Sequence, residues 1–356
     1  MYNCLHCIIP PYMMQKLINQ TSSRTDLLQQ IASKEIDDKL RGRRQLYNAL
    51  SESTRAMIKS RPLKKSAKTI TVNREVYTAL NKEVLPGKLL RKEGEKPIKD
   101  TDVNNVYDAA GFTWDYYYSV FGRNSIDGKG LKIIQSVHYG KKYDNAMWDG
   151  QQMLYGDGDG KIFGTFTRDI DIIGHELTHG VIQNECDLEY RDQPGALNES
   201  LADVFGIMIK QKKLNLDAKK SNWLIGENVV LGDQYALRSF KAPGTAYKNH
   251  PQLGTDPQPA HMKNYTDDPY DYGGVHLNSG ITNHAFYLAA YDIGGFAWEK
   301  AGQIWYAAMC DTKSIKRNAT FLDFKNATIK HAELLFKSDK SISKIVTKAW
   351  NAVGVK

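Results

Sequence analysis

The segment DIDIIGHELTHGVIQN, residues 169–184, restricts the possible folds of this 356-residue chain more than any other feature. Its apolar residues recur close to the i, i+3, i+4 spacing of an amphipathic helix. Positions i and i+4 lie on one face of a helix, so His175 and His179 can direct both imidazoles at one ion. The pattern His-Glu-x-x-His arises by chance on the order of once in a hundred chains of this length. Other parts of the sequence must therefore support a metal site.

A second helical segment, PGALNESLADVFGIMIKQ at 194–211, supplies the missing groups. A catalytic zinc ion needs three protein ligands and one open position, and Glu199 can be the third ligand. Asp203 lies one turn further on the same face and can hold the free ring nitrogen of a zinc histidine, with Asn198 in a similar supporting position. Glu176 falls beside the histidines but is angled away, as a general base would be.

Groups that could stabilise a developing oxyanion also occur in the sequence. His276 stands in the Gly-rich stretch DYGGVHLNSG, which predicts a turn just before a helix. Tyr190 follows the histidine-bearing helix. Asp271 could keep His276 oriented and charged.

The bulk composition excludes several classes of protein. No run of 18 apolar residues exists, so no transmembrane helix is expected. Four cysteines in so long a chain do not indicate a disulfide framework. The net charge of +8 includes the basic clusters RGRR at 41–44 and RPLKK at 61–65. We interpret these clusters as solvated, protease-accessible segments and expect no nucleic-acid partner, because no nucleic-acid motif accompanies them.

The pattern along the chain predicts an α+β fold, with strands first and helices after. Residues 1–65 indicate short amphipathic helices appended to a body, with Pro10 and Pro11 breaking any helix there. Alternation predicts strands in 68–79 and 130–140. Helices are expected at the end of the chain and at several earlier positions: 101–122, 169–184, 194–211, 278–294, 298–311, 320–337 and 341–355.

Several motifs together resemble the thermolysin family of neutral zinc endopeptidases. They are HELTHGVIQ, Tyr190, GALNESLAD, GGVHLNSGITNHAFY and YDNAMWDGQQMLYGDGDG at 143–160. The resemblance covers about residues 100–356, and the N-terminal PPY segment is similar to the protealysin-like branch, which carries a short propeptide. It implies a two-domain zincin with its cleft along the zinc helix. The expected divisions are a propeptide at 1–55 (end uncertain within 45–68), a β-rich domain at 56–186 and a helical domain at 187–356. Residues 1–55 are called the leader below.

The resemblance also implies roles for individual residues. His175, His179 and Glu199 would bind one zinc ion, and Glu176 would move a proton from the attacking water to the leaving amine. His276 and Tyr190 would stabilise the oxyanion. The remaining implied residues support the site or bind substrate: Asp271 orienting His276, Asp203 supporting His175, Asn145 and the Ala146 backbone holding the substrate as an added strand, Arg238 gripping a carbonyl, and Phe163, Ile172 and Leu237 lining the pocket for the residue after the scissile bond (P1'). A preference for Leu, Phe, Ile or Val at P1' follows.

The double calcium site common in the family is expected to be lost here. Asp171 and Glu227 match two of its ligands, but Lys210 stands where the pattern has an acid. Asn222 and Leu224 replace two more ligands. We hypothesise that the Lys210 ammonium takes the place of calcium.

The leader carries a second hypothesis, that Pro10, Pro11 and Tyr12 lie near the cleft and block it. An alternative is that Cys4, His6 or Cys7 binds the zinc directly. Activation would follow self-cleavage within 45–68.

Location and partners are less constrained by the sequence. The N-terminus lacks the features of a secretory signal, so release by a non-classical route is expected, with a cytoplasmic location as the alternative. Partners would be peptide and protein substrates and the leader in cis, and we expect a monomer. Rival functions are a scaffold that has lost activity and another zincin hydrolase such as an aminopeptidase. The retention of Glu176 argues against the first, and the absence of an amine-binding motif argues against the second.

Overall fold

The computed structural model describes residues 6–49, 70–232 and 234–356. Within these ranges no helix has the length and apolar character needed to cross a membrane. The helices and strands are β1 (His6–Cys7), α1 (Pro11–Gln20), α2 (Arg24–Ala49), β2 (Arg74–Thr78), β3 (Lys88–Lys92), α4 (Thr101–Phe121), β4 (Ile133–Val137), β5 (Ala146–Trp148), β6 (Met153–Tyr155), α5 (Ile170–Asn184), α6 (Asp192–Leu214), β7 (Leu224–Ile225), β8 (Arg238–Ser239), η1 (Met262–Asn264), η2 (Pro269–Asp271), α7 (Val275–Ile293), α8 (Ala301–Cys310), α9 (Phe321–Leu335) and α10 (Ser341–Ala352).

A mixed six-stranded sheet forms one half of the molecule, in the order β1-β5-β6-β4-β2-β3. β4 runs parallel to β2 and β6, and the other neighbours are antiparallel. The leader provides the edge strand β1, which pairs with β5. If β1 were removed, β5 would be the edge of this sheet, and an exposed edge strand can accept another extended chain.

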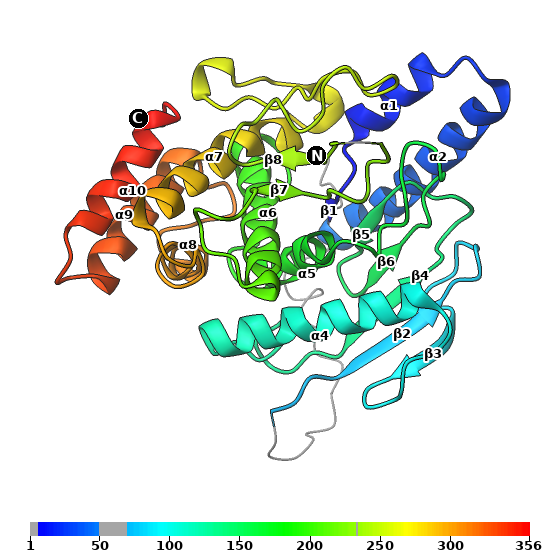
Figure 1. Cartoon of the computed structure of the whole chain (residues 1–356), viewed down its shortest axis with the longest axis horizontal. Helices are drawn as coiled ribbons and strands as arrows, with labels where there is room; N and C mark the ends of the chain where they lie inside the picture. Colours follow the sequence, from blue (N-terminus) through cyan, green and yellow to red (C-terminus); the bar gives the residue numbers. More distant parts are fainter. Residues whose placement is uncertain (1–5, 50–69, 233) are drawn as a thin grey trace.

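The helix pair α5 and α6 lies beside the sheet and carries the histidine and glutamate motifs (Figure 1). Gly206 of α6 permits a close approach, because a Cβ added there would lie 2.6 Å from the carbonyl oxygen of Asp171. The two helices therefore pack with their backbones close together. This packing brings Glu199 and Asp203 to the histidine-bearing face of α5.

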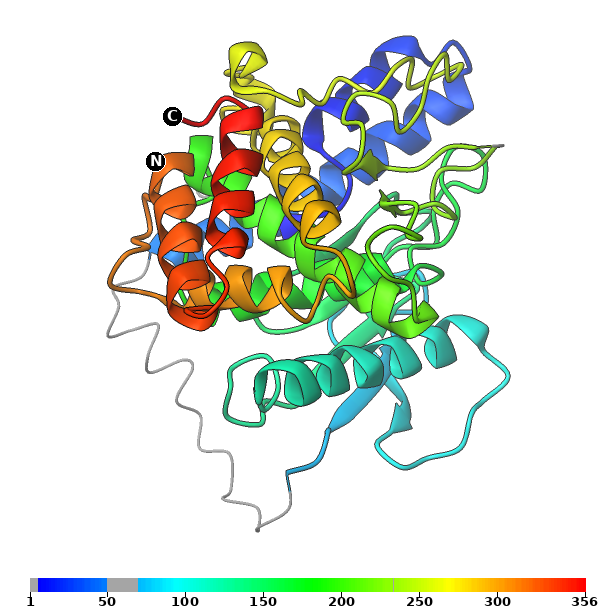
Figure 2. The same cartoon turned by 60° about the vertical axis from the view of Figure 1, so that its left-hand side comes forward.

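Helices dominate the C-terminal half, as Figure 2 shows. α7 packs against α6 and α10, while α9 packs against α8 and α10. The expected α+β architecture, with a mixed-sheet half followed by a helical half, is confirmed. α7 begins at Val275, slightly before the expected helix, so His276 lies in the first turn of α7 and not in a preceding turn.

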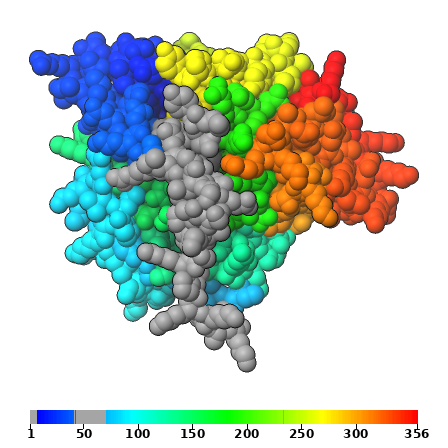
Figure 3. Space-filling model, turned by 180° about the vertical axis from the view of Figure 1, so that it is seen from behind, coloured from blue at the N-terminus to red at the C-terminus, as the bar shows by residue number. Residues whose placement is uncertain are grey.

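The leader packs on the body through both of its helices. Pro10 is extended, but α1 begins at the very next residue, Pro11. The expectation that the two prolines break any helix here was therefore wrong at Pro11, because the fixed φ and missing N–H of proline suit the first position of a helix. Met13, Met14 and Leu17 of α1 are buried in the main hydrophobic core. Figure 3 shows the blue leader against the yellow segment that precedes α7. The expected end of the leader, 45–68, lies largely outside the described residues.

Candidate active site

Three side chains from α5 and α6 converge on one point. The Nε2 atoms of His175 and His179 lie 2.9 Å apart. The Glu199 carboxylate oxygens lie 3.5 Å from Nε2 of His175 and 3.4 Å from Nε2 of His179. All three side chains are fully buried. Two imidazole nitrogens and one carboxylate form a donor set typical of a catalytic zinc site.

The second nitrogen of each imidazole fixes its orientation. Nδ1 of His175 donates to Asp203 Oδ1 at 2.8 Å, and Nδ1 of His179 donates to Asn198 Oδ1 at 3.0 Å. With Nδ1 protonated in a neutral ring, Nε2 presents a lone pair. Two lone pairs facing each other beside a carboxylate are repulsive unless a cation lies between them. The residues therefore fit a zinc ion, with Asp203 and Asn198 supporting its ligands.

The side chain of Glu176, which belongs to α5, points toward the sheet. Its Oε2 accepts a hydrogen bond from the backbone N–H of Trp148 in β5 at 2.9 Å. The side chain is fully buried and belongs to neither the His–His–Glu cluster nor its supporting pair. Glu176 is thus placed beside the strand along which an extended chain would bind.

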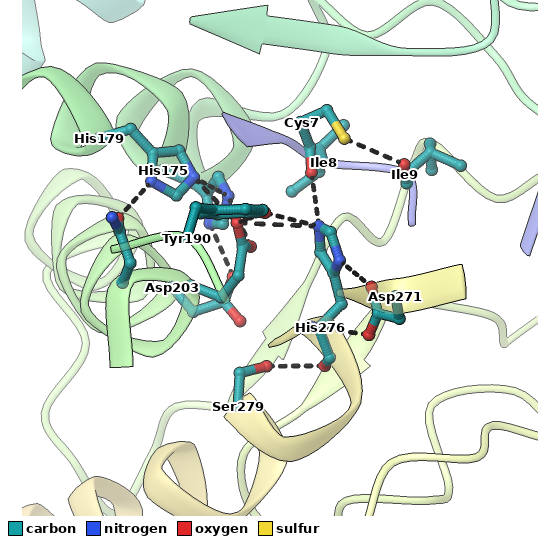
Figure 4. A network of polar contacts seen from close by, with 12 residues as sticks. Cys7, Ile8, Ile9, His175, His179, Tyr190, Asp203, Asp271, His276 and Ser279 are labelled. Atoms are coloured by element: carbon teal, nitrogen blue, oxygen red, sulfur yellow. Dashed lines mark hydrogen bonds and ion pairs between the residues drawn. The ribbon is translucent and has the colours of Figure 1, made fainter. Parts of the chain in front are cut away.

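His276 enters the site from α7, oriented by Asp271 (Figure 4). Oδ1 of Asp271 accepts from Nδ1 of His276 at 2.5 Å, while Oδ2 accepts the backbone N–H groups of His276 and Leu277. Nε2 of His276 lies 3.1 Å from the Tyr190 hydroxyl, which donates to Glu199. Burial alone would lower the pKa of His276, but the carboxylates of Glu199 and Asp271 outweigh burial and raise it. Both predicted oxyanion-binding groups therefore point at the metal site.

Arg238 of β8 lies between the metal site and the leader. One guanidinium nitrogen donates to Asp203 Oδ1 at 2.8 Å, and another donates to the Ile8 carbonyl at 3.2 Å. Burial would raise the pKa of Asp203, but the positive charge of Arg238 and the hydrogen bonds from Arg238 and His175 hold it well below its usual value. Asp203 is thus a buried anion that accepts from both His175 of the metal site and Arg238 of the leader contact.

The leader lies along β5 as an added strand. His6 pairs with Trp148 and Cys7 with Met147, antiparallel. The Ile8 N–H donates to the Ala146 carbonyl at 3.3 Å. The Asn145 side chain accepts from the Ile9 N–H at 2.9 Å and donates to the Ile9 carbonyl at 3.2 Å. The leader therefore occupies the groups that were predicted to bind substrate.

Cys7 and Ile8 lie on opposite sides of the sheet, as expected of successive residues in an extended chain. Ile8 is fully buried in the same core cluster as Phe163, Ile172 and Leu237, the three predicted pocket residues. Cys7 belongs to a different cluster, on the side of α2.

This alternation bears on the proposal that a leader thiol binds zinc. The Cys7 thiol donates to the Ile9 carbonyl at 3.4 Å and does not join the cluster of His175, His179 and Glu199. Direct zinc binding by Cys7 is therefore not the arrangement of the described chain. Cys4 and the side chain of His6 lie outside the described residues.

The leader's principal contacts lie outside the segment predicted to block the cleft. That segment was Pro10, Pro11 and Tyr12, whereas Cys7, Ile8 and Ile9 contact His276, Arg238 and Asn145. Pro11 and Tyr12 lie in the first turn of α1, which packs near η2. The sequence feature that could have indicated this contact segment is the adjacent pair of apolar residues Ile8 and Ile9 in a polar leader.

Lys210 occupies the region where calcium ligands were expected. Its ammonium lies 3.1 Å from Asp171 Oδ2, forms an ion pair with Glu227 and donates to the Leu224 carbonyl at 2.9 Å. Asn222 also donates to Glu227. Burial raises the pKa of Asp171 to about 6, and the Lys210 charge limits that rise. Asp171, Glu227 and Leu224, three of the expected calcium-site positions, thus meet around the Lys210 ammonium.

Comparison with known proteins decides the family. The model "Thermolysin metallopeptidase, catalytic domain" matches residues 34–183, and "Thermolysin metallopeptidase, alpha-helical domain" matches residues 186–355. The chain belongs to the thermolysin family of metallopeptidases. As a member of this family with the His175–His179–Glu199 site, it is a zinc metallopeptidase that acts on peptide substrates.

The relatives of this thermolysin-family metallopeptidase include proteins that match most of its length. It is 49% identical over 285 residues to "Extracellular metalloprotease" of Pectobacterium carotovorum subsp. carotovorum, covering 80% of this chain and 81% of that protein. It is 43% identical over 358 residues to "Protease PrtS" of Photorhabdus sp. (strain Az29), covering 98% and 92%. Among solved structures, the precursor of protealysin, a metalloproteinase from Serratia proteamaculans, matches with a TM-score of 0.84 and 46% identity, over 99% of this chain and 100% of that chain. The expected resemblance to the protealysin-like branch is confirmed.

Proposed function

We propose that this chain is the precursor of a neutral zinc endopeptidase, kept inactive by its own leader until it processes itself. The observation that carries the proposal is that the predicted metal site and an extended segment of the leader meet in one place. The His175–His179–Glu199 cluster lies beside Glu176 and His276. An extended segment of the leader lies across the same groups. A groove that binds an extended peptide beside a zinc-type site suits hydrolysis of internal peptide bonds.

The proposed chemistry divides among the residues that surround the cluster. Zinc bound by His175, His179 and Glu199 would supply Lewis acidity and an acidified water. Glu176 takes the proton of the attacking water and delivers it to the leaving amine. His276 and Tyr190 donate hydrogen bonds to the carbonyl oxygen as negative charge develops on it. Asp271 is a positioning residue that acts through His276.

Substrate binding is proposed to follow the contacts that the leader makes. Asn145 and the Ala146 carbonyl bind the backbone after the scissile bond, and Arg238 binds a carbonyl there. Phe163, Ile172 and Leu237 are buried and apolar, so they favour a bulky hydrophobic residue at P1'. Since the leader makes these contacts in the precursor, it excludes a substrate from the groove.

We also propose that Lys210 replaces the calcium pair of related enzymes. An ammonium placed between Asp171 and Glu227 supplies the positive charge that a hard cation would otherwise provide. Stability of this chain would then not require calcium.

Release outside the cell is proposed because a relative with 49% identity is named an extracellular metalloprotease. The proposed partners are protein substrates and the leader in cis, and the proposed state is a monomer. The proposed domain limits remain 1–55, 56–186 and 187–356.

The test measures zinc content and cleavage of an internally quenched peptide by the processed wild type and by Glu176→Ala. We expect one zinc per chain in both proteins and loss of turnover in the variant on the order of a thousandfold or more. A chelator should abolish wild-type cleavage, and added zinc should restore it. Cleavage that removes only N-terminal residues, or full activity of Glu176→Ala, would refute the proposal.

A further inference from the structure

The leader crosses the site with one of its peptide bonds beside the catalytic groups (Figure 4). The Cys7 carbonyl oxygen accepts a hydrogen bond from Nε2 of His276 at 3.0 Å. The same nitrogen lies 3.1 Å from the Tyr190 hydroxyl and 3.7 Å from Oε1 of Glu199. The Cys7 carbonyl is therefore held by the group proposed to stabilise an oxyanion.

Contacts on the carboxyl side of Cys7 fix the register. The Ile8 N–H donates to the Ala146 carbonyl, and the Ile8 carbonyl accepts from Arg238. Asn145 then holds both backbone groups of Ile9. A slip by one residue would move every side chain to the opposite face of the sheet.

We propose that the Cys7–Ile8 peptide bond occupies the position of the scissile bond and that the precursor hydrolyses this bond in cis. The inference rests on the proposed function and names its first substrate. The hydroxyl of water adds to the Cys7 carbonyl carbon, and the C–N bond to Ile8 breaks. Glu176 carries the proton of the water to the Ile8 nitrogen. The products are a chain ending in the Cys7 carboxylate and a chain beginning with the Ile8 amine.

The side chains on the two sides of this bond suit that assignment. Ile8 is 0% exposed and shares its core cluster with Phe163, Ile172 and Leu237. A buried β-branched hydrophobic residue thus stands directly after the proposed scissile bond, where a hydrophobic residue is expected. The Cys7 side chain lies in the opposite cluster and so does not enter the metal site.

This cut would not open the groove. Ile8 and Ile9 keep their bonds to Arg238 and Asn145, and α1 stays anchored through its buried Met13, Met14 and Leu17. The shortened leader would remain as a bound product. Activity toward other substrates should therefore wait for the later cut within 45–68.

The experiment follows the N-terminus of the full-length chain. Metal-free precursor receives zinc, and intact-mass spectrometry with N-terminal sequencing records each new species over time. We expect a new N-terminus at Ile8 before peptide-cleaving activity rises, and no such species from Glu176→Ala. A first new N-terminus at Ile9, or an uncut Cys7–Ile8 bond in a precursor that has become active, would overturn the inference.

Variants at Ile8 test the register. Ile8→Leu should still be cut, whereas Ile8→Asp should slow the cut by roughly a hundredfold or more, because a carboxylate would enter an apolar pocket. Leu28→Asp is the matched control, since Leu28 lies in the leader but is 59% exposed. In inactive Glu176→Ala, the Ile8 and Ile9 amides should resist hydrogen exchange. Rapid exchange of both amides there would show that the register is wrong.

A separate assay distinguishes this inference from the proposed function. Limited trypsin treatment of the precursor, directed at the basic segments 41–44 and 61–65, should detach the leader. Suppose that the precursor keeps its Cys7–Ile8 bond after zinc addition, and that its trypsin product then cleaves the peptide. That result overturns only the inference. A product that binds no zinc after zinc addition and cleaves no peptide overturns the proposed function itself.

Discussion

Asp203 accepts a hydrogen bond from Arg238 through Oδ1, the same atom that accepts from His175, and both distances are 2.8 Å. One buried carboxylate therefore orients a predicted zinc ligand and a residue that grips the leader. The metal site and the leader contact of Arg238 are coupled through this oxygen, so a change in either should affect the other.

Replacing Asp203 with Asn should disturb both the metal site and the position of Arg238. Arg238 would keep a buried positive charge without its anion, which should cost about 3–5 kcal/mol of unfolding free energy. Zinc affinity should fall roughly 10–100-fold, because His175 loses its supporting carboxylate. Denaturant unfolding and competition with a fluorescent chelator measure the two effects. Asp292→Asn, at a partly exposed surface ion pair with Lys348, is the control and should change neither.

Replacing Lys210 with Met should destabilise the protein by about 2–4 kcal/mol, because Asp171 and Glu227 would repel each other without the ammonium. The variant should regain part of that stability in millimolar calcium, whereas wild type should be indifferent to calcium removal. Thermal unfolding with and without a calcium-selective chelator, at constant zinc, measures this. The exposed Lys219→Met serves as the control. A large loss of wild-type melting temperature on calcium removal alone would contradict the idea.

Asp37 of α2 should govern how firmly the leader is held. Its Oδ1 accepts from the Tyr143 hydroxyl at 2.6 Å and from Asn145 Nδ2 at 3.1 Å. Asp37→Ala would remove the acceptor of both hydrogen bonds and weaken leader docking by about 1–3 kcal/mol. Conversion of precursor to mature protein, followed on gels, should accelerate. The adjacent Asp38→Ala removes only an exposed pair with Lys34 and should leave the rate unchanged. Equal rates for the two variants would count against the role of Asp37.

His138 should make stability depend on alkaline pH. A hydrogen bond to Asp157, together with one to Asp100, raises the pKa of His138 to about 9, although partial burial opposes the rise. Because the folded pKa lies above the ordinary 6.5, this stabilisation is complete below about pH 6.5 and is lost as pH rises through about 9. Since the ring is partly exposed, we expect a contribution of about 1–2 kcal/mol.

Melting temperatures of wild type and His138→Gln between pH 6 and 10 check this prediction. The difference between the two proteins should be largest near pH 6 and shrink toward pH 10. A difference that is independent of pH would mean that the charge of His138 does not contribute.

The sequence alone located the groups whose geometry is local. A helix places residues four apart on one face, so the spacing predicted that His175 and His179 share one face and that Glu199 and Asp203 share another. The packing of α5 against α6 then joins the two faces into one cluster. The two-part order of strands and helices likewise predicted the α+β class, which the structure and the family match confirm.

Only the tertiary structure decided how the leader meets the site. Ile9 and Asn145 are 136 residues apart, and the pairing of β1 with β5 depends on which sheet edge the folded body presents. No periodic pattern encodes such a contact, because backbone hydrogen bonds are common to all sequences. The same holds for Asp37, whose partners Tyr143 and Asn145 are set by packing. Local spacing thus determined the chemistry, while long-range pairing determined which peptide bond that chemistry faces.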